Sequence, residues 1–118
     1  MEPKLRGGEL CKYLERGVDE ERIIRLIAYH ARAGTDPVAW AREHAAETRG
    51  MPGMRKVEFV HSIDDPSLWG AIMHFRTNED LKTYKATGFY KGASESLTKA
   101  VLDNTKPVHE HLFEVIDA

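Results

Sequence analysis

The most constraining feature of this sequence is a pair of alternating segments separated by one short turn. Residues Arg55–Ile63 and Leu68–Arg76 each repeat apolar side chains at every second position, the period of a strand with one buried face. The four residues between them, Asp64–Ser67, include aspartate, proline and serine, which favour turns. The two segments therefore predict an antiparallel hairpin, and the rest of the chain must fold around it.

A strand and a helix are predicted before this hairpin. Residues Arg22–Arg32 are rich in isoleucine and other strand-forming residues, are apolar on both faces, and end at Ala33–Gly34. A strand with this pattern is expected to be covered on both sides. The following residues supply a capping side chain and a proline for the first helical turn, so Pro37–Arg49 is predicted to be a helix that ends at Gly50.

Helical segments and a final strand are predicted after the hairpin. Thr77 offers a hydroxyl cap, acidic residues follow it in the first turn, and Gly88 interrupts the helix. Residues Phe89–Leu102 continue a helical pattern, and Val108–Ile116 are predicted to form the last strand.

The predicted order of elements defines the fold class. Strand, helix, strand, strand, helix, strand is the βαββαβ order of ferredoxin-like α+β folds, with a four-stranded antiparallel sheet. Two helices cover one face of such a sheet and leave the other open. We therefore expect a homodimer formed through the open sheet face.

Composition places this fold in a single domain. The chain has 118 residues, of which 42% are hydrophobic, which suits one core. Residues 22–118 are predicted to form the ferredoxin-like domain, and residues 1–21 an N-terminal extension with a short helix at Glu9–Arg16.

Charge and hydropathy argue against two classes of partner. The 17 basic residues nearly balance 19 acidic ones and are scattered along the chain, so no nucleic-acid groove is predicted. No apolar run approaches the roughly 20 residues of a membrane span, and no membrane partner is expected. The single cysteine, Cys11, cannot form an internal disulfide, which favours a reducing, cytoplasmic location.

Three segments carry a resemblance to a known group of proteins. Residues Gly50–Met54 precede an extended run, and Leu81–Tyr84 are followed by Thr87–Lys91. With these segments, the chain from about Arg22 to Asp117 resembles the dimeric α/β-barrel superfamily, and within it the antibiotic biosynthesis monooxygenase domains. The resemblance implies a cleft between sheet and helices that binds a small hydrophobic molecule of the aromatic, quinol or polyketide class. Some such proteins oxidise anthrones or quinols with molecular oxygen, and we expect no cofactor.

The sequence departs from the motifs of individual branches of that group. The anthrone-oxidising branch has asparagine, tryptophan and tyrosine at positions that fall on Ala71, Phe75 and Leu81. The haem-degrading branch has a histidine ligand where this chain has Ser94, and a polyketide-processing branch has a His-Pro-x-His run at Thr87–Tyr90. The resemblance therefore supports the fold more strongly than one reaction.

Histidines and aromatic residues are the candidates for chemistry. We expect His61 or His74 to act as a base, because imidazole titrates near neutral pH, and Tyr90 to orient the substrate. The apolar side chains that could line a pocket between sheet and helices are Trp69, Met73, Phe75, Tyr84 and Phe89. Core packing accounts equally well for most of these residues. His109 and His111 lie on one face of a predicted strand, but no third ligand is identifiable and no metal site is predicted.

Three functions remain open on this evidence. The first is a cofactor-independent monooxygenase acting on a small aromatic, quinol or polyketide-like molecule. The second is an isomerase or cyclase of the same fold that uses histidine and tyrosine for proton transfer. The third is a stress-related protein that binds a small molecule without reacting.

Overall fold

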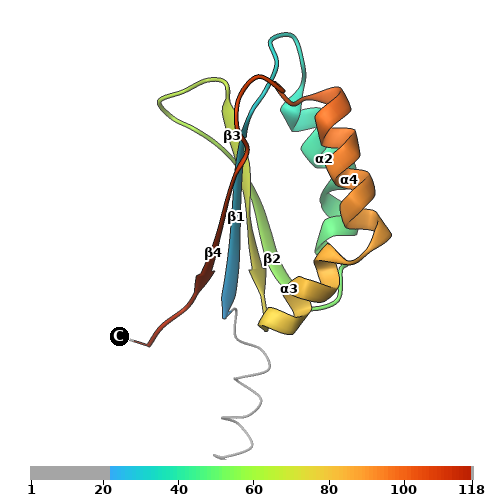
Figure 1. Cartoon of the computed structure of the whole chain (residues 1–118), viewed down its shortest axis with the longest axis vertical. Helices are drawn as coiled ribbons and strands as arrows, with labels where there is room; N and C mark the ends of the chain where they lie inside the picture. Colours follow the sequence, from blue (N-terminus) through green and yellow to red (C-terminus); the bar gives the residue numbers. More distant parts are fainter. Residues whose placement is uncertain (1–21, 118) are drawn as a thin grey trace, which may run out of the picture.

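The computed structural model describes residues 22–117, which form four strands and three helices (Figure 1). In chain order these are β1 (Ile23–His30), α2 (Pro37–Arg49), β2 (Met54–His61), β3 (Leu68–Phe75), α3 (Asn78–Lys85), α4 (Gly88–Ala100) and β4 (His109–Glu114). The helix predicted at Glu9–Arg16, and with it the N-terminal extension, lies outside the described residues. No helix in the range 22–117 has the length and apolar character needed to cross a membrane.

The sheet confirms the predicted fold class. Its four strands pair antiparallel in the order β2-β3-β1-β4. The hairpin of β2 and β3 therefore lies on one side of β1, and β4 lies on the other side and forms an edge of the sheet. This is the ferredoxin-like arrangement of the βαββαβ order. The strands are one or two residues shorter than predicted at several ends. Beyond His30, for example, regular pairing is replaced by an isolated bridge between Ala31 and Leu102.

Side-chain caps determine where the helices begin. Asp36 accepts a hydrogen bond from the backbone N–H of Ala39 at the start of α2, at 3.0 Å, and Pro37 occupies the first turn. Thr77 caps α3 in the same way. Thr87 caps α4, so the break between the two C-terminal helices lies one residue before the predicted Gly88, which is instead the first residue of α4.

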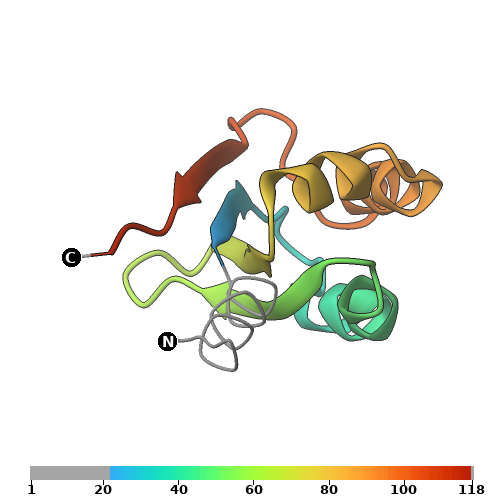
Figure 2. The same cartoon turned by 90° about the horizontal axis from the view of Figure 1, so that it is seen from below.

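The helices cover one face of the sheet and leave the other open. Figure 1 shows all three helices on the same side of the strands, and Figure 2 shows α2 and α4 lying side by side there. Trp40 of α2 joins the two helices through a hydrogen bond from Nε1 to Ser96 Oγ, at 3.0 Å. We expected β1 to be covered on both sides, but in the described part of the chain helices cover it on one side only.

The core lies between the sheet and the helices. Phe75 of β3 is fully buried and packs against Tyr84 of α3, with 5.4 Å between ring centroids. Met54 and Val57 of β2 and Leu81 of α3 complete this buried layer. A second cluster forms at the other end of the sheet around Tyr29 and the residues that follow α4. The space between the two clusters is where the candidate site lies.

Candidate functional site

An outer groove lies between α2 and the ends of β2 and β3 where they meet at the hairpin. Its volume is about 280 Å³, just below the range of roughly 300–1,000 Å³ that is usual for pockets that bind small organic molecules. Side chains of α2 form one wall, and aromatic residues of the sheet form the floor. The lining residues include Val38, Ala41, Ala45, Phe59, His61 and Trp69.

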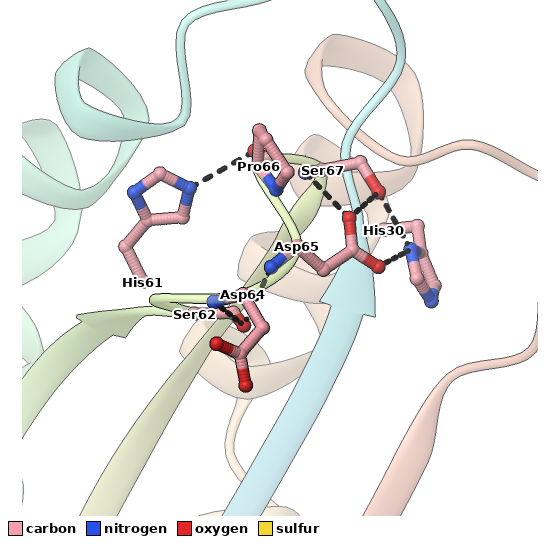
Figure 3. A network of polar contacts seen from close by, with 7 residues as sticks. All are labelled: His30, His61, Ser62, Asp64, Asp65, Pro66 and Ser67. Atoms are coloured by element: carbon pink, nitrogen blue, oxygen red, sulfur yellow. Dashed lines mark hydrogen bonds and ion pairs between the residues drawn. The ribbon is translucent and has the colours of Figure 1, made fainter.

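His61 is the titratable imidazole in the wall of this groove. Its ring stacks on Trp69, with centroids 3.6 Å apart and an angle of 5° between the ring planes. Its Nε2 lies 2.9 Å from the carbonyl oxygen of Pro66. A dashed line marks this contact in Figure 3. A carbonyl only accepts hydrogen bonds, so Nε2 carries the hydrogen of the neutral ring, and the lone pair that could take a proton is on Nδ1.

In the other half of the hairpin turn, a serine and an aspartate contact a histidine at the end of β1 (Figure 3). Ser67 Oγ donates a hydrogen bond to Asp65 at 2.8 Å, and His30 Nδ1 lies 2.9 Å from the same Oγ. Asp65 is 3.8 Å from that same ring nitrogen. A catalytic triad requires serine and carboxylate on opposite nitrogens of the imidazole. This cluster therefore ties the turn to the end of β1 and does not activate a nucleophile.

An inner cavity of about 60 Å³ lies deeper, between the sheet and helices α2 and α4. Tyr29, Phe59 and Gly70 line both the groove and this cavity, so the two spaces are adjacent. The remaining lining contains aromatic, aliphatic and hydroxyl side chains, the sulfur of Met73 and one charged group. It includes Arg25, Met73, Tyr84, Tyr90, Ala93 and Leu97.

Arg25 brings a positive charge into this apolar surrounding. Only 3% of the residue is exposed, because it points from β1 toward the helices. Its Nε donates to Glu110 at 2.5 Å, its Nη1 contacts the sulfur of Met73 at 3.5 Å, and the guanidinium carbon lies 5.4 Å from the ring centroid of Tyr90. Arginine stays protonated in proteins, so the charge is permanent.

Glu110 of β4 connects Arg25 to Lys85 of α3. The Nζ of Lys85 lies 3.0 Å from one carboxylate oxygen of Glu110 and 2.8 Å from the other. Partial burial opposes ionisation of Glu110, but the hydrogen bonds from Lys85 and Arg25 outweigh it and lower the pKa of this carboxyl. Two cations thus share one carboxylate, and the cluster carries surplus positive charge.

Buried phenols face the same region. Burial raises the pKa of Tyr29 to about 12, and burial also raises the pKa of Tyr84, although the nearby Arg25 charge partly opposes that shift. Both phenols therefore remain protonated at neutral pH and can donate a hydrogen bond. Tyr84 packs edge-on against Tyr90, with 5.2 Å between centroids, which fixes both rings.

The structure brings together some of the residues predicted from the sequence. His61 and Trp69 meet in the outer groove, and Met73, Tyr84 and Tyr90 line the inner cavity. The remaining candidates lie elsewhere.

His74 and two aromatic candidates are placed away from the two spaces. His74 lies on the open face of the sheet, near Glu58, because it is adjacent in β3 to the inward-facing Met73. Phe75 packs in the core, and Phe89 packs beside His44, with 6.5 Å between their ring centroids; neither lines the groove or the cavity.

His109 and His111 also lie on the open face, on β4. Their register opposite Ala28 and Leu26 of β1 places them there. Within residues 22–117, no group of three or more histidine, cysteine, aspartate or glutamate side chains is arranged to hold a metal ion.

Sequence reasoning missed Arg25 and Tyr29. Both occupy alternate positions of the first strand, on the same face as Ile23 and Ile27. A lone arginine at an inward position of an otherwise apolar strand was the available signal. Its partner, Glu110, lies 85 residues further along the chain, so sequence alone could not show that the charge is paired.

Comparison with known proteins places this fold among solved structures. A candidate antibiotic biosynthesis monooxygenase from Deinococcus radiodurans matches 81% of this chain and 94% of its own, with a TM-score of 0.70 and 17% identity. A candidate antibiotic biosynthesis monooxygenase from Nitrosomonas europaea matches 81% and 91%, with a TM-score of 0.68 and 14% identity. No protein-family model and no curated protein matches the sequence itself.

A third structure has a named activity. It is a variant of SnoaB, a cofactor-independent oxygenase from Streptomyces nogalater, and it matches 84% of this chain and 97% of its own, with a TM-score of 0.67 and 12% identity. The chain has the fold of the antibiotic biosynthesis monooxygenases. This confirms the predicted resemblance at the level of fold. Of the three positions at which the sequence departs from the anthrone-oxidising monooxygenases, only Ala71 lines the inner cavity, whereas Phe75 and Leu81 pack in the core.

Proposed function

We propose that this protein is a cofactor-independent monooxygenase-like enzyme that acts on a small aromatic, quinol or polyketide-like molecule. The observation that carries the proposal is the outer groove, where an imidazole stacked on Trp69 lies in a wall that is mainly apolar but also contains Arg42 and Arg49. The likeness of the fold to SnoaB and to the two candidate monooxygenases supports the reaction class.

The proposed chemistry needs a base and an apolar enclosure. Removal of a proton from an activated methylene or phenol leaves an electron-rich anion that can reduce molecular oxygen. In the overall reaction, a methylene and one O₂ give a carbonyl and one water: one oxygen atom enters the product and the other takes both hydrogens. The groove is open and His61 is exposed, so its apolar wall shields a bound molecule from bulk water on one side only.

His61 is the residue that we assign as the base. Its Nε2–H is held by the Pro66 carbonyl, which leaves Nδ1 as the proton acceptor, and Trp69 fixes the plane of the ring. The flat indole also offers a surface on which an aromatic substrate can stack. Tyr90, in the adjacent cavity, is assigned to orient the substrate. His74 is left out of this assignment because it lies on the opposite face of the sheet.

Oxygen consumption with a panel of anthrones and quinols tests the proposal. We expect His61→Gln to lower the rate by about 10²- to 10⁴-fold, the usual contribution of a general base, because glutamine keeps a donor for Pro66 but accepts no proton. His44→Gln is the matched control. His44 Nδ1 likewise contacts a backbone carbonyl, that of Trp40 at 2.9 Å, but His44 lines neither the groove nor the cavity.

Two outcomes contradict the proposal in different ways. Equal rates for His61→Gln and the wild-type protein remove the assigned base. Turnover that continues without oxygen, with an isomerised or cyclised product, replaces oxygenation by proton-transfer chemistry in the same groove.

We also propose that a second copy of the chain covers the open sheet face. Ile24 and Leu26 of β1 and Ile72 of β3 lie there, and Phe113 of β4 is 52% exposed. Apolar side chains on a sheet face favour association. Sedimentation equilibrium should give twice the mass of the chain, and a monomer at micromolar concentration contradicts the proposal.

A further inference from the structure

The buried guanidinium of Arg25 retains hydrogen-bond donors that the described residues leave unused. Arginine has five N–H donors. Nε binds Glu110 and Nη1 contacts the sulfur of Met73, but within residues 22–117 Nη2 makes no hydrogen bond. Buried polar groups in proteins nearly always have a partner, so an unpaired donor in a residue that is 3% exposed points to an absent one.

The charge balance around Arg25 favours an anionic partner. Glu110 is shared between Arg25 and Lys85, so one carboxylate offsets two cations. The phenols of Tyr84 and Tyr90 line the same cavity as the guanidinium, as do the hydroxyl side chains of Thr48 and Ser94. Tyr84 is 4% exposed, and the described part of the chain offers its hydroxyl no hydrogen-bond partner. An incoming anionic oxygen could therefore accept from both Arg25 and Tyr84.

The size of the cavity limits what can enter it. An apolar cavity of about 150 Å³ binds a benzene molecule, whereas this one has about 60 Å³. It has room for a small oxygen-bearing group but not for a ring. The adjacent groove has about 280 Å³, and Tyr29, Phe59 and Gly70 line both spaces. A planar ligand can thus lie against these shared residues with its ring in the groove and its oxygen in the cavity.

We propose that Arg25 is the anion-binding residue of the cleft and that the natural ligand is a planar aromatic molecule carrying one anionic oxygen group. The group is a phenolate, an enolate or a carboxylate. Glu110 and Lys85 are positioning residues that hold the guanidinium in place. This inference rests on the proposed function in one respect, because it takes the groove to be the place where an aromatic molecule binds.

Calorimetric titration of the full chain with three probes tests the proposal. Naphthoate is an anion, naphthamide is its neutral counterpart of similar shape, and an acidic nitronaphthol supplies a phenolate at neutral pH. We expect at least one anion to bind the wild-type protein about 10- to 100-fold more tightly than the amide, the range of a charge-assisted hydrogen bond. Whichever anion binds more tightly distinguishes a phenolate from a carboxylate ligand.

Substitutions show whether Arg25 causes the preference for the anion over the amide. Arg25→Met keeps most of the side-chain volume and should abolish the preference for the anion, while Arg25→Lys should retain part of it. Arg76→Met is the control, because Arg76 also pairs with a carboxylate, that of Asp80, but lies outside both spaces. The comparison of anion and amide on the wild-type protein needs no variant, so the proposal can be tested even if Arg25→Met does not fold.

The outcomes separate the two proposals. Equal binding of anion and amide to the wild-type protein contradicts the Arg25 site, assigns its spare donor to ordered water, and leaves the groove as a binding site. A preference for the anion that survives in Arg25→Met also contradicts it. Failure of all three probes to bind contradicts the groove as an aromatic site and the Arg25 assignment with it.

Discussion

Gly70 is the position at which one added methyl group should disturb the sheet most. It is buried in β3, between Ala28 of β1 and Val60 of β2. A Cβ built there would lie 2.3 Å from the carbonyl oxygen of Ile27, roughly an ångström closer than ordinary contact. The obstacle is backbone, so no side-chain rotation relieves it, and β1 and β3 would have to separate.

We expect Gly70→Ala to lower the free energy of unfolding by about 1–3 kcal/mol, the usual cost of overpacking a core. At this chain length the loss corresponds to a fall in Tm of roughly 4–12 °C. Urea denaturation followed by circular dichroism measures the free energy directly, and the midpoint should move with little change in slope.

Gly92→Ala is the matched control for this experiment. Gly92 lies inside α4, is exposed, and a Cβ there meets nothing within 4 Å. The same substitution should therefore stabilise the protein by about 0.5–1 kcal/mol, because alanine is the better helix former. Two alanine variants that shift stability in the same direction, or a Gly70→Ala protein as stable as wild type, would refute the packing argument.

Two further predictions concern the turns that frame the site. Thr87→Ala should cost about 1–2 kcal/mol in urea denaturation, because Thr87 Oγ1 both caps α4 at Tyr90 N and donates to the carbonyl of Tyr84, at 3.1 and 2.7 Å; an unchanged midpoint contradicts this. Hydrogen bonds from the backbone and side chain of Ser67 lower the pKa of Asp65. The ionised Asp65 carboxylate therefore stabilises the folded state fully above the ordinary carboxyl pKa of about 4. This stabilisation is lost as the pH falls through the lower pKa that Asp65 has in the folded protein. Thermal unfolding of Ser67→Ala between neutral and acid pH should therefore show a weaker loss of Tm below about pH 4 than wild type does, and parallel curves contradict the assignment.

Much of the fold followed from local signals in the sequence. The boundaries of α2 were predicted as observed, because a capping aspartate, a proline and a terminal glycine mark both ends. The hairpin followed from alternation around one short turn. Strand ends were less predictable, since pairing partners decide them: Ala31 continues β1 only as an isolated bridge to Leu102, which no local pattern reveals.

The site was predicted only in part, because it depends on strand register. In the observed register His61 pairs with Trp69 and His74 pairs with Lys56, so the two histidines project from opposite faces of the sheet. Both residues were candidate bases because both are histidines, and only the strand pairing shows that they lie on different faces. Arg25 was overlooked for a related reason: an arginine in a strand is normally expected to face solvent, and its buried position depends on a carboxylate from β4.

The cavity that contains Arg25 depends on β4, an edge strand of the sheet, because β4 supplies the carboxylate that pairs with the guanidinium. Glu110 belongs to β4, which is bonded to a single neighbour, β1, in the described sheet. Neighbouring residues of a strand point to opposite faces, so a slip of β4 by one residue would turn Glu110 away from the helices. The guanidinium of Arg25 would then keep its buried charge without a counterion. A one-residue deletion in the loop before β4 would thus change the electrostatics of the cleft without altering any residue that lines it.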